Sequence, residues 1–197
     1  MKKIFGRTVT FGAALATLLS ICAVASATEA TFDGTLEKIE KDGVVVVGYR
    51  ESSIPFSYYD DAKNPIGYSM DFVDLVLERI KAKLNQPELQ VRKVPITSQN
   101  RISLLQNGTI DFECTTTTHN KSREQQVDFS NSIFVVGTRL LTKVDSGIKD
   151  FPDLKGQNVV VGAGTTSEIL LRKMNAEKNM DMNIISAKDH SESFLTL

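Results

Sequence analysis

The chain has 197 residues, of which 41% are hydrophobic and 24% charged, and its formal net charge is −1. It has no basic run of the kind that attracts nucleic acid or an anionic membrane surface, so we expect no nucleic-acid partner. Past residue 27, no stretch approaches the ~18 consecutive apolar residues that a membrane-spanning helix needs.

Residues 1–27 have the pattern of a secretory signal peptide. Three basic residues precede an apolar run over residues 11–24: Lys2, Lys3 and Arg7. Ala25-Ser26-Ala27 is a small-residue cleavage site, and cleavage there leaves 20 basic and 24 acidic residues, a net charge of −4. We expect export with cleavage near Ala27. A membrane anchor is the alternative, as is a lipoprotein, although Cys22 has no lipobox spacing around it.

Residues 28–134 are predicted to form one α/β lobe. Its expected elements are a short helix from Leu36, a buried β-branched strand over 44–47, an amphipathic helix over 69–84, a strand over 89–96, a helix over 100–107 and a strand over 110–115. Right-handed crossovers turn such a β-α-β-α-β order into an open parallel sheet.

Residues 135–142, within the extended run IFVVGTRLLTK, are predicted to be a crossover strand that acts as a hinge. Residues 143–197 then begin a second α/β lobe. We expect its strands over 159–161 and 182–186, with a helix over 167–175 between them. The sequence ends inside a helical pattern, so we expect the second lobe to be incomplete and the chain to be truncated. The fold class is therefore α/β with two lobes and open, mostly parallel sheets.

Polar residues follow every predicted strand, where ligands of open α/β sheets bind. These residues are Arg50, Ser98 with Arg101, Thr115 to Thr118, the loop Gly162-Ala-Gly-Thr-Thr166, and His190. Each has an ordinary explanation, such as a solvated arginine, a β-rich threonine run or a threonine helix cap. Polar residues at the ends of five predicted strands, spread over two lobes, predict a ligand-binding cleft.

The charges of this set predict the kind of ligand. Arg50, Arg101 and Arg123, with His190, supply three or four donors rich in positive charge, and arginine binds a carboxylate bidentately. A neutral amino acid needs only one arginine, for its α-carboxylate. A dicarboxylic amino acid would use the other arginines for its side-chain carboxylate. The Gly162–Thr166 loop lacks the Gly-Lys-Ser/Thr ending of a Walker motif. We expect no catalytic residue, no metal and no cofactor.

Several motifs resemble the amino-acid-binding solute-binding proteins of bacterial ABC importers, family 3. They are Pro55-Phe56, Leu105-x-x-Gly108-x-x-Asp111, Arg123 before Val127-Asp-Phe-Ser130, and Asp153-Leu-Lys-Gly156. The strings RESSIPFSYYD, PITSQNRI, FVVGTRLLTK and IISAKDH are similar to the glutamate/aspartate branch. Ser69 departs from the pattern, which usually has an acidic residue there.

The resemblance implies a type II periplasmic-binding-protein fold and a periplasmic monomer. It would bind L-glutamate or L-aspartate and deliver it to the membrane subunits of an ABC permease. It also implies the site residues. Arg123, Thr118 and Thr166 match the α-carboxylate clamp, and Arg50, Arg101, His190, Ser98 and Thr116 match the acidic branch. The acidic residue that anchors the α-ammonium would lie past residue 197.

Two further interpretations stay open. An enzyme of the same fold, similar to some dehydratases, would need a tuned acid in the cleft; Glu113 is a thin candidate that we expect to pair with a neighbour. A ligand-sensing module of a receptor would need a membrane segment after the binding domain.

Cys114 is predicted to be a buried thiol or to pair with a cysteine past residue 197.

Overall fold

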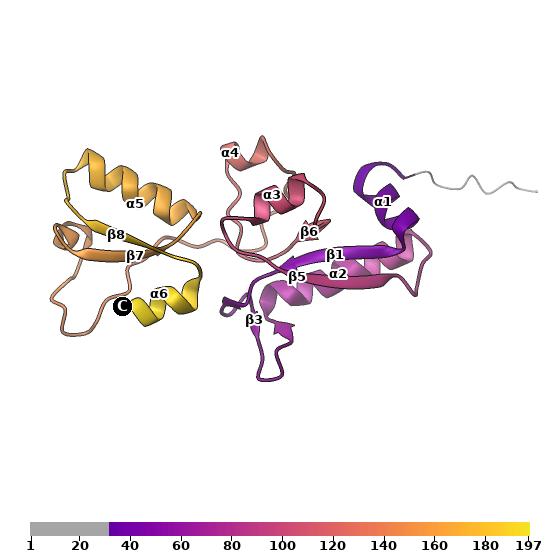
Figure 1. Cartoon of the computed structure of the whole chain (residues 1–197), viewed down its shortest axis with the longest axis horizontal. Helices are drawn as coiled ribbons and strands as arrows, with labels where there is room; N and C mark the ends of the chain where they lie inside the picture. Colours follow the sequence, from indigo (N-terminus) through magenta and orange to yellow (C-terminus); the bar gives the residue numbers. More distant parts are fainter. Residues whose placement is uncertain (1–31) are drawn as a thin grey trace, which may run out of the picture. The chain divides into compact units, whose positions relative to one another are not determined.

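A computed structural model describes residues 32–197 (Figure 1), so the predicted signal peptide lies outside the described residues. The first lobe contains α1 (Gly34–Asp42), β1 (Val44–Tyr49), β2 (Ser52–Ser53), β3 (Ser57–Tyr59), β4 (Pro65–Ile66), α2 (Tyr68–Lys83), β5 (Gln90–Pro95), α3 (Arg101–Gln106), β6 (Phe112–Glu113) and α4 (Lys121–Glu124). The second contains the 3₁₀ helix η1 (Phe151–Leu154), β7 (Asn158–Gly162), α5 (Thr166–Glu177), β8 (Asn183–Ala187) and α6 (His190–Thr196).

The first lobe is built on a parallel sheet of order β5-β1-β6, as the β-α-β-α-β pattern predicts. The central strand β1 pairs with β5 along its whole length, from Val44 opposite Gln90 onward. Its four consecutive valines suit a strand that is covered on both faces. β6 is shorter than the predicted strand over 110–115, because only Phe112 and Glu113 pair with β1. The threonines that follow therefore lie outside the sheet.

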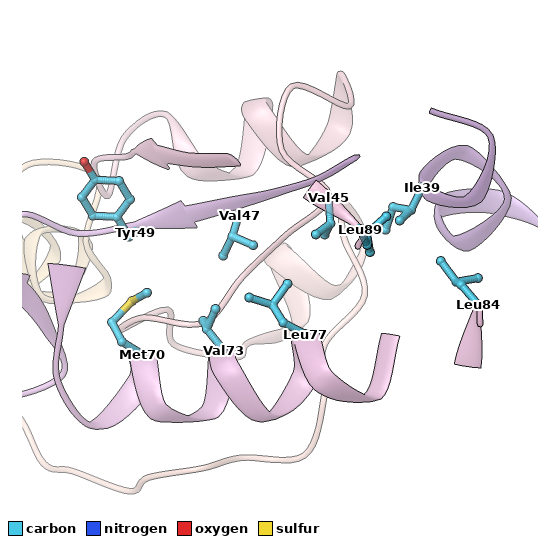
Figure 2. Close-up of a cluster of buried hydrophobic side chains, with 9 residues drawn as sticks. All are labelled: Ile39, Val45, Val47, Tyr49, Met70, Val73, Leu77, Leu84 and Leu89. Carbon is cyan, nitrogen blue, oxygen red and sulfur yellow. The ribbon is translucent and has the colours of Figure 1, made fainter. Parts of the chain in front are cut away.

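The main core of this lobe lies between β1 and α2. Figure 2 shows Met70, Val73 and Leu77 on one face of α2, pointing toward Val45 and Val47 of β1. Their spacing of three and four residues brings them to one side of a helix. All five are at most 7% exposed. Burying a side chain of this size contributes about 1.5–3 kcal/mol, so this face fixes α2 against the sheet.

A buried carboxylate, Asp111, ties the two ends of the lobe's sequence together. It accepts hydrogen bonds from Lys38 Nζ and from the backbone N–H of Val46, each at 2.7 Å, and the Asp111 side chain is 1% exposed. Lys38 Nζ also donates to the Gly108 carbonyl at 2.9 Å. The Leu105-x-x-Gly108-x-x-Asp111 motif thus anchors α1 and β1 to the turn before β6.

A small antiparallel sheet, β2-β3-β4, lies where the sequence shows only turn residues. Its strands have two or three residues each, too few for a period-2 pattern to be recognised. Ser57 of β3 accepts a hydrogen bond from the Arg50 backbone N–H at 2.9 Å and donates to the Arg50 carbonyl at 3.0 Å. This sheet therefore holds the backbone of a predicted site residue in place.

The second lobe has the parallel pair β7-β8 with α5 beside it (Figure 1). Its core consists of four buried side chains: Leu154, Leu171, Met180 and Met182. The crossover strand predicted over 135–142 is not formed, since the segment belongs to no strand of the structure. A strand needs a neighbour to bond with, and no other strand within residues 32–197 pairs with it. No helix in this range is both long and apolar enough to cross a bilayer.

We predict that Asp111→Ala lowers the free energy of unfolding by about 2–4 kcal/mol, because it leaves the Lys38 ammonium and the buried Val46 N–H without an acceptor. Lys38→Met should cost clearly less, since the Lys38 side chain is 40% exposed and Asp111 keeps its bond to Val46. Urea titration followed by circular dichroism measures both. Equal losses in the two variants would contradict this role of Asp111.

Candidate functional site

Arg101 is the most unusual side chain of the structure. It is the first residue of α3 and is only 2% exposed. Its Nε and Nη1 are buried and have no hydrogen-bond partner within residues 32–197. Burial lowers the pKa of this guanidinium to about 10, against the opposing charge of Glu113, and the charges of Arg123 and Arg50 lower it further. At neutral pH Arg101 is still a cation, and it presents two unused N–H donors.

Arg50 follows β1 and lies in the same region. It is 2% exposed, and its Nη1 donates to the hydroxyl of Ser98 at 2.8 Å. Burial lowers its pKa, while the carboxylates of Asp189 and Glu113 act to raise it. The parallel pairing of β1 and β5 brings Arg50 and Ser98 together, as the rule for carboxyl ends of parallel strands predicts.

Arg123 lies on α4, a short helix that begins after Asn120, whose side chain accepts the Arg123 backbone N–H at 2.9 Å. Its Nη1 donates to the Thr118 carbonyl at 2.9 Å and its Nη2 to the Gly164 carbonyl at 3.2 Å. Burial lowers the pKa of Arg123, and the charge of Glu113 opposes this. The second of these bonds joins the first lobe to the loop between β7 and α5.

The loop between β7 and α5 makes further contacts with the first lobe. The hydroxyls of Thr118 and Thr166 are 3.4 Å apart. Gly164 has a φ of +72°, and a Cβ atom on it would lie 2.8 Å from Cα of Gln99. Only glycine meets both demands. The Gly162–Thr166 loop thus serves as a close contact with the residues that surround Arg101 and Arg123.

Reasoning from the sequence alone undervalued the part that Glu113 has in the site. Its two carboxylate oxygens accept hydrogen bonds from the hydroxyls of Thr115 and Thr117. Its charge acts on all three arginines described above. The expected pairing with neighbours is present, but the neighbours are threonine hydroxyls. The available signal was the position of Glu113 two residues before the first of four consecutive threonines.

Thr116 and His190, the remaining predicted site residues, make fewer contacts than the arginines. Thr116 is half-buried, and its hydroxyl makes no hydrogen bond within residues 32–197. His190 is the first residue of α6 and has solvent access. Loss of hydration lowers the pKa of His190, and the charges of Arg50 and Arg101 lower it further against that of Asp189. The lowered pKa favours the neutral form of the His190 imidazole at neutral pH.

Cys114 packs against the main core of the first lobe, as the buried-thiol interpretation predicts. Burial and the nearby Glu113 raise the pKa of its thiol to about 11, so it carries a proton at neutral pH. It is unpaired within the part of the chain that the structure describes. In that same part, no three histidine, cysteine or acidic side chains lie close enough together to hold a metal ion.

The profile of the bacterial extracellular solute-binding proteins, family 3, matches residues 45–192. The chain belongs to this family. It is 64% identical to the glutamate/aspartate import solute-binding protein of Salmonella typhimurium over 163 residues, which are 83% of this chain and 54% of that protein. It is 58% identical to the L-glutamate/L-aspartate-binding protein of Pseudomonas aeruginosa, over 94% of this chain and 60% of that protein.

The chain thus spans little more than half the length of these relatives. Among solved structures, it is similar to an ancestral amino-acid-binding protein that is a precursor of cyclohexadienyl dehydratase. The TM-score is 0.70 at 29% identity, over 82% of this chain and 68% of that one. The fold is the type II periplasmic-binding-protein fold, as the resemblance implied. The members of the family are extracellular or periplasmic binding proteins.

We predict that His190 of this chain titrates below its ordinary pKa of 6.5, and that Arg50→Gln raises the midpoint by removing a nearby positive charge. Because the folded-state pKa lies below the unfolded one, His190 should lower stability progressively as the pH falls below about 6.5, and should have no effect above it. Nuclear magnetic resonance of the imidazole protons measures the midpoint, with His119→Gln used to assign the two histidines. A midpoint that Arg50→Gln leaves unchanged would contradict the assigned cause.

Proposed function

We propose that this protein is the substrate-binding component of an ABC importer, which captures L-glutamate or L-aspartate in the periplasm and presents it to the permease subunits of the membrane. The observation that carries the proposal is Arg101, a buried guanidinium with two N–H donors that bond to no acceptor in the part of the chain that the structure describes. A buried charge of this kind is costly unless an anion pairs with it. A ligand carboxylate has the geometry that a guanidinium matches best.

The number of arginines supports an acidic amino acid over a neutral one. Arg50, Arg101 and Arg123 are each at most 8% exposed. One of them is enough for the α-carboxylate that all amino acids share. We assign the α-carboxylate to Arg123 with Thr118 and Thr166, which lie at the contact between the lobes. We assign the side-chain carboxylate to Arg101.

Four further residues complete the proposed site. Arg50 and Ser98, which bond to each other, support the side-chain carboxylate beside Arg101. His190 offers a neutral imidazole and Thr116 a hydroxyl that is free to turn toward the ligand. These assignments follow the site residues that the resemblance implied. The names of the two relatives, both glutamate/aspartate proteins, agree with them.

We propose that residues 135–142 act as the hinge between the lobes. Within residues 32–197 this segment forms no helix or strand, and Val135, Val136 and Leu141 are 65% exposed or more. Hinges are loop residues that absorb changes in backbone angle while the parts they join stay rigid. The contacts of Arg123 and Thr118 with the β7-α5 loop would close over a ligand when the hinge bends.

Calorimetric titration of the complete gene product tests the proposal. L-Glutamate or L-aspartate should bind at least 100-fold more tightly than L-glutamine or L-asparagine, because an amide leaves buried guanidiniums without a counter-charge. The amides are matched controls, since they differ from the acids by one group. Comparable affinity for L-glutamine would refute the acidic ligand, and no binding of any amino acid would refute the function.

The two assigned roles predict different effects of substitution. Arg123→Met should weaken binding of every amino acid, whereas Arg101→Met should mainly remove the preference for an acidic side chain. Removing one partner of a buried charge pair costs roughly 2–5 kcal/mol. Arg79→Met, a change of an exposed arginine on α2, is the control and should bind as the unchanged protein does. If both site variants lose the acids and the amides equally, the division of roles is wrong.

A further inference from the structure

The threonine run of residues 115–118, which carries Thr116 and Thr118 of the proposed site, lies outside regular secondary structure. β6 ends at Glu113, and no residue of the run makes a backbone–backbone hydrogen bond within residues 32–197. Glu113 accepts hydrogen bonds from two hydroxyls of the run, which hold its side chains and not its peptide groups. Without a strand ladder, other side chains must fix the backbone here, because an unheld segment keeps its conformational freedom.

Ser69, in the first turn of α2, holds the first peptide group of this run. Its hydroxyl donates to the Thr115 carbonyl at 2.9 Å. Ser69 is 0% exposed and Thr115 is 8% exposed, so the bond is shielded from water. A buried carbonyl that loses its donor is not readily compensated by solvent, which makes this bond more costly to lose than an exposed one.

Ser69 is itself firmly held. Its backbone N–H donates to the Phe56 carbonyl at 2.9 Å, and the N–H of Tyr68 donates to the Pro55 carbonyl at 3.0 Å. Gly67, just before them, has a φ of +122°, and a Cβ atom on it would lie 2.7 Å from both of these carbonyl oxygens. The start of α2 is therefore packed tightly against the segment between β2 and β3, and the Ser69 hydroxyl is a fixed donor.

The bond from Ser69 also orients Thr116. The peptide group between Thr115 and Thr116 is trans, so its C=O and its N–H point in opposite directions. With the C=O held by Ser69, the N–H of Thr116 faces away from that side chain. This N–H makes no hydrogen bond with another backbone group within residues 32–197. Ser69 thus determines which way the backbone of Thr116 faces.

Only a hydrogen-bond donor can have this role. Position 69 is where the family's pattern usually has an acidic residue, and an ionised carboxylate accepts hydrogen bonds but has none to donate. An aspartate there would place its oxygens against the Thr115 carbonyl oxygen. The departure from the family's pattern at Ser69 therefore has a physical consequence for the threonine run.

We propose that Ser69 is a positioning residue of the ligand site, which holds the Thr115 carbonyl so that Thr116 faces the ligand. This inference rests on the proposed function and on the place of Thr116 in the site. Ser69 acts only through the threonine run. Without its hydroxyl, the run must be ordered when the ligand binds, and ordering the backbone of one residue weakens binding by a factor of about 5–30.

Calorimetric titration of the complete gene product with L-glutamate tests this role in Ser69→Ala and Ser69→Asp. Both variants should bind about tenfold more weakly than the unchanged protein, since neither can donate to Thr115. Ser69→Asp is the second variant because a negative charge in the first turn of a helix is favourable. It removes the donor while it favours the start of α2. If Ser69→Ala does not fold, Ser69→Asp decides alone.

Two controls separate positioning from stability. Ser53→Ala removes a hydroxyl that is also 0% exposed but has no hydrogen-bond partner within residues 32–197. Val73→Ala leaves a cavity in the core face of α2 and lowers stability without changing the bond to the run. Both should bind L-glutamate as the unchanged protein does, with folding checked by urea titration.

A folded Ser69 variant that binds L-glutamate as tightly as the unchanged protein would overturn the inference. A loss of affinity in Val73→Ala as large as in Ser69→Ala would also overturn it, because affinity would then follow stability alone. Failure of the unchanged protein to bind any amino acid would instead overturn the proposed function.

Discussion

Mutual repulsion among buried guanidiniums is the constraint on which the rest of this structure depends. Arg50, Arg101 and Arg123 come from three separate elements, yet each is almost fully removed from water. Two of them act on the pKa of Arg101 as like charges. Holding them together consumes part of the free energy that the core supplies, because charged groups lose hydration and gain little from one another. Such an arrangement is stable enough to persist only on a rigid support.

For Arg50 and Arg123, the support comes from short local contacts. Ser57 bonds the backbone of Arg50, Ser98 bonds its guanidinium, and Asn120 bonds the backbone of Arg123. These contacts are backbone-directed or neutral, so they position the cations without neutralising them. Behind them, α2 packed on β1 provides the solid layer (Figure 2). The packed core therefore gives these contacts a rigid base.

The sequence was sufficient for elements whose residues have a strong period. The four valines of β1 and the apolar spacing of α2 predicted both within one or two residues. The β2-β3-β4 sheet was not predicted, because strands of two or three residues are too short to show the alternating pattern of a strand. The strand predicted over 135–142 was wrong for the opposite reason: its apolar residues have the composition of a strand, but a ladder also needs a partner.

The site could be predicted to the level of residue type and sheet edge. Parallel strands place their carboxyl ends together, which is why Arg50, Ser98 and Arg101 could be grouped from sequence. The sequence could not predict the protonation state or the hydrogen-bond partners of each side chain. The orphaned donors of Arg101, the neutral imidazole of His190 and the threonine-bound carboxylate of Glu113 depend on burial and on distances between elements. These are properties of the folded chain.

The bond from Arg123 Nη2 to the Gly164 carbonyl has a consequence for how this guanidinium is held. Arg123 has a peptide acceptor on each terminal nitrogen, the Thr118 carbonyl on one and the Gly164 carbonyl on the other. A guanidinium has five N–H donors, so these two bonds fix its plane and leave three donors for an anion. Any displacement of the β7-α5 loop would therefore also turn the guanidinium, and the direction in which its remaining donors point depends on both segments.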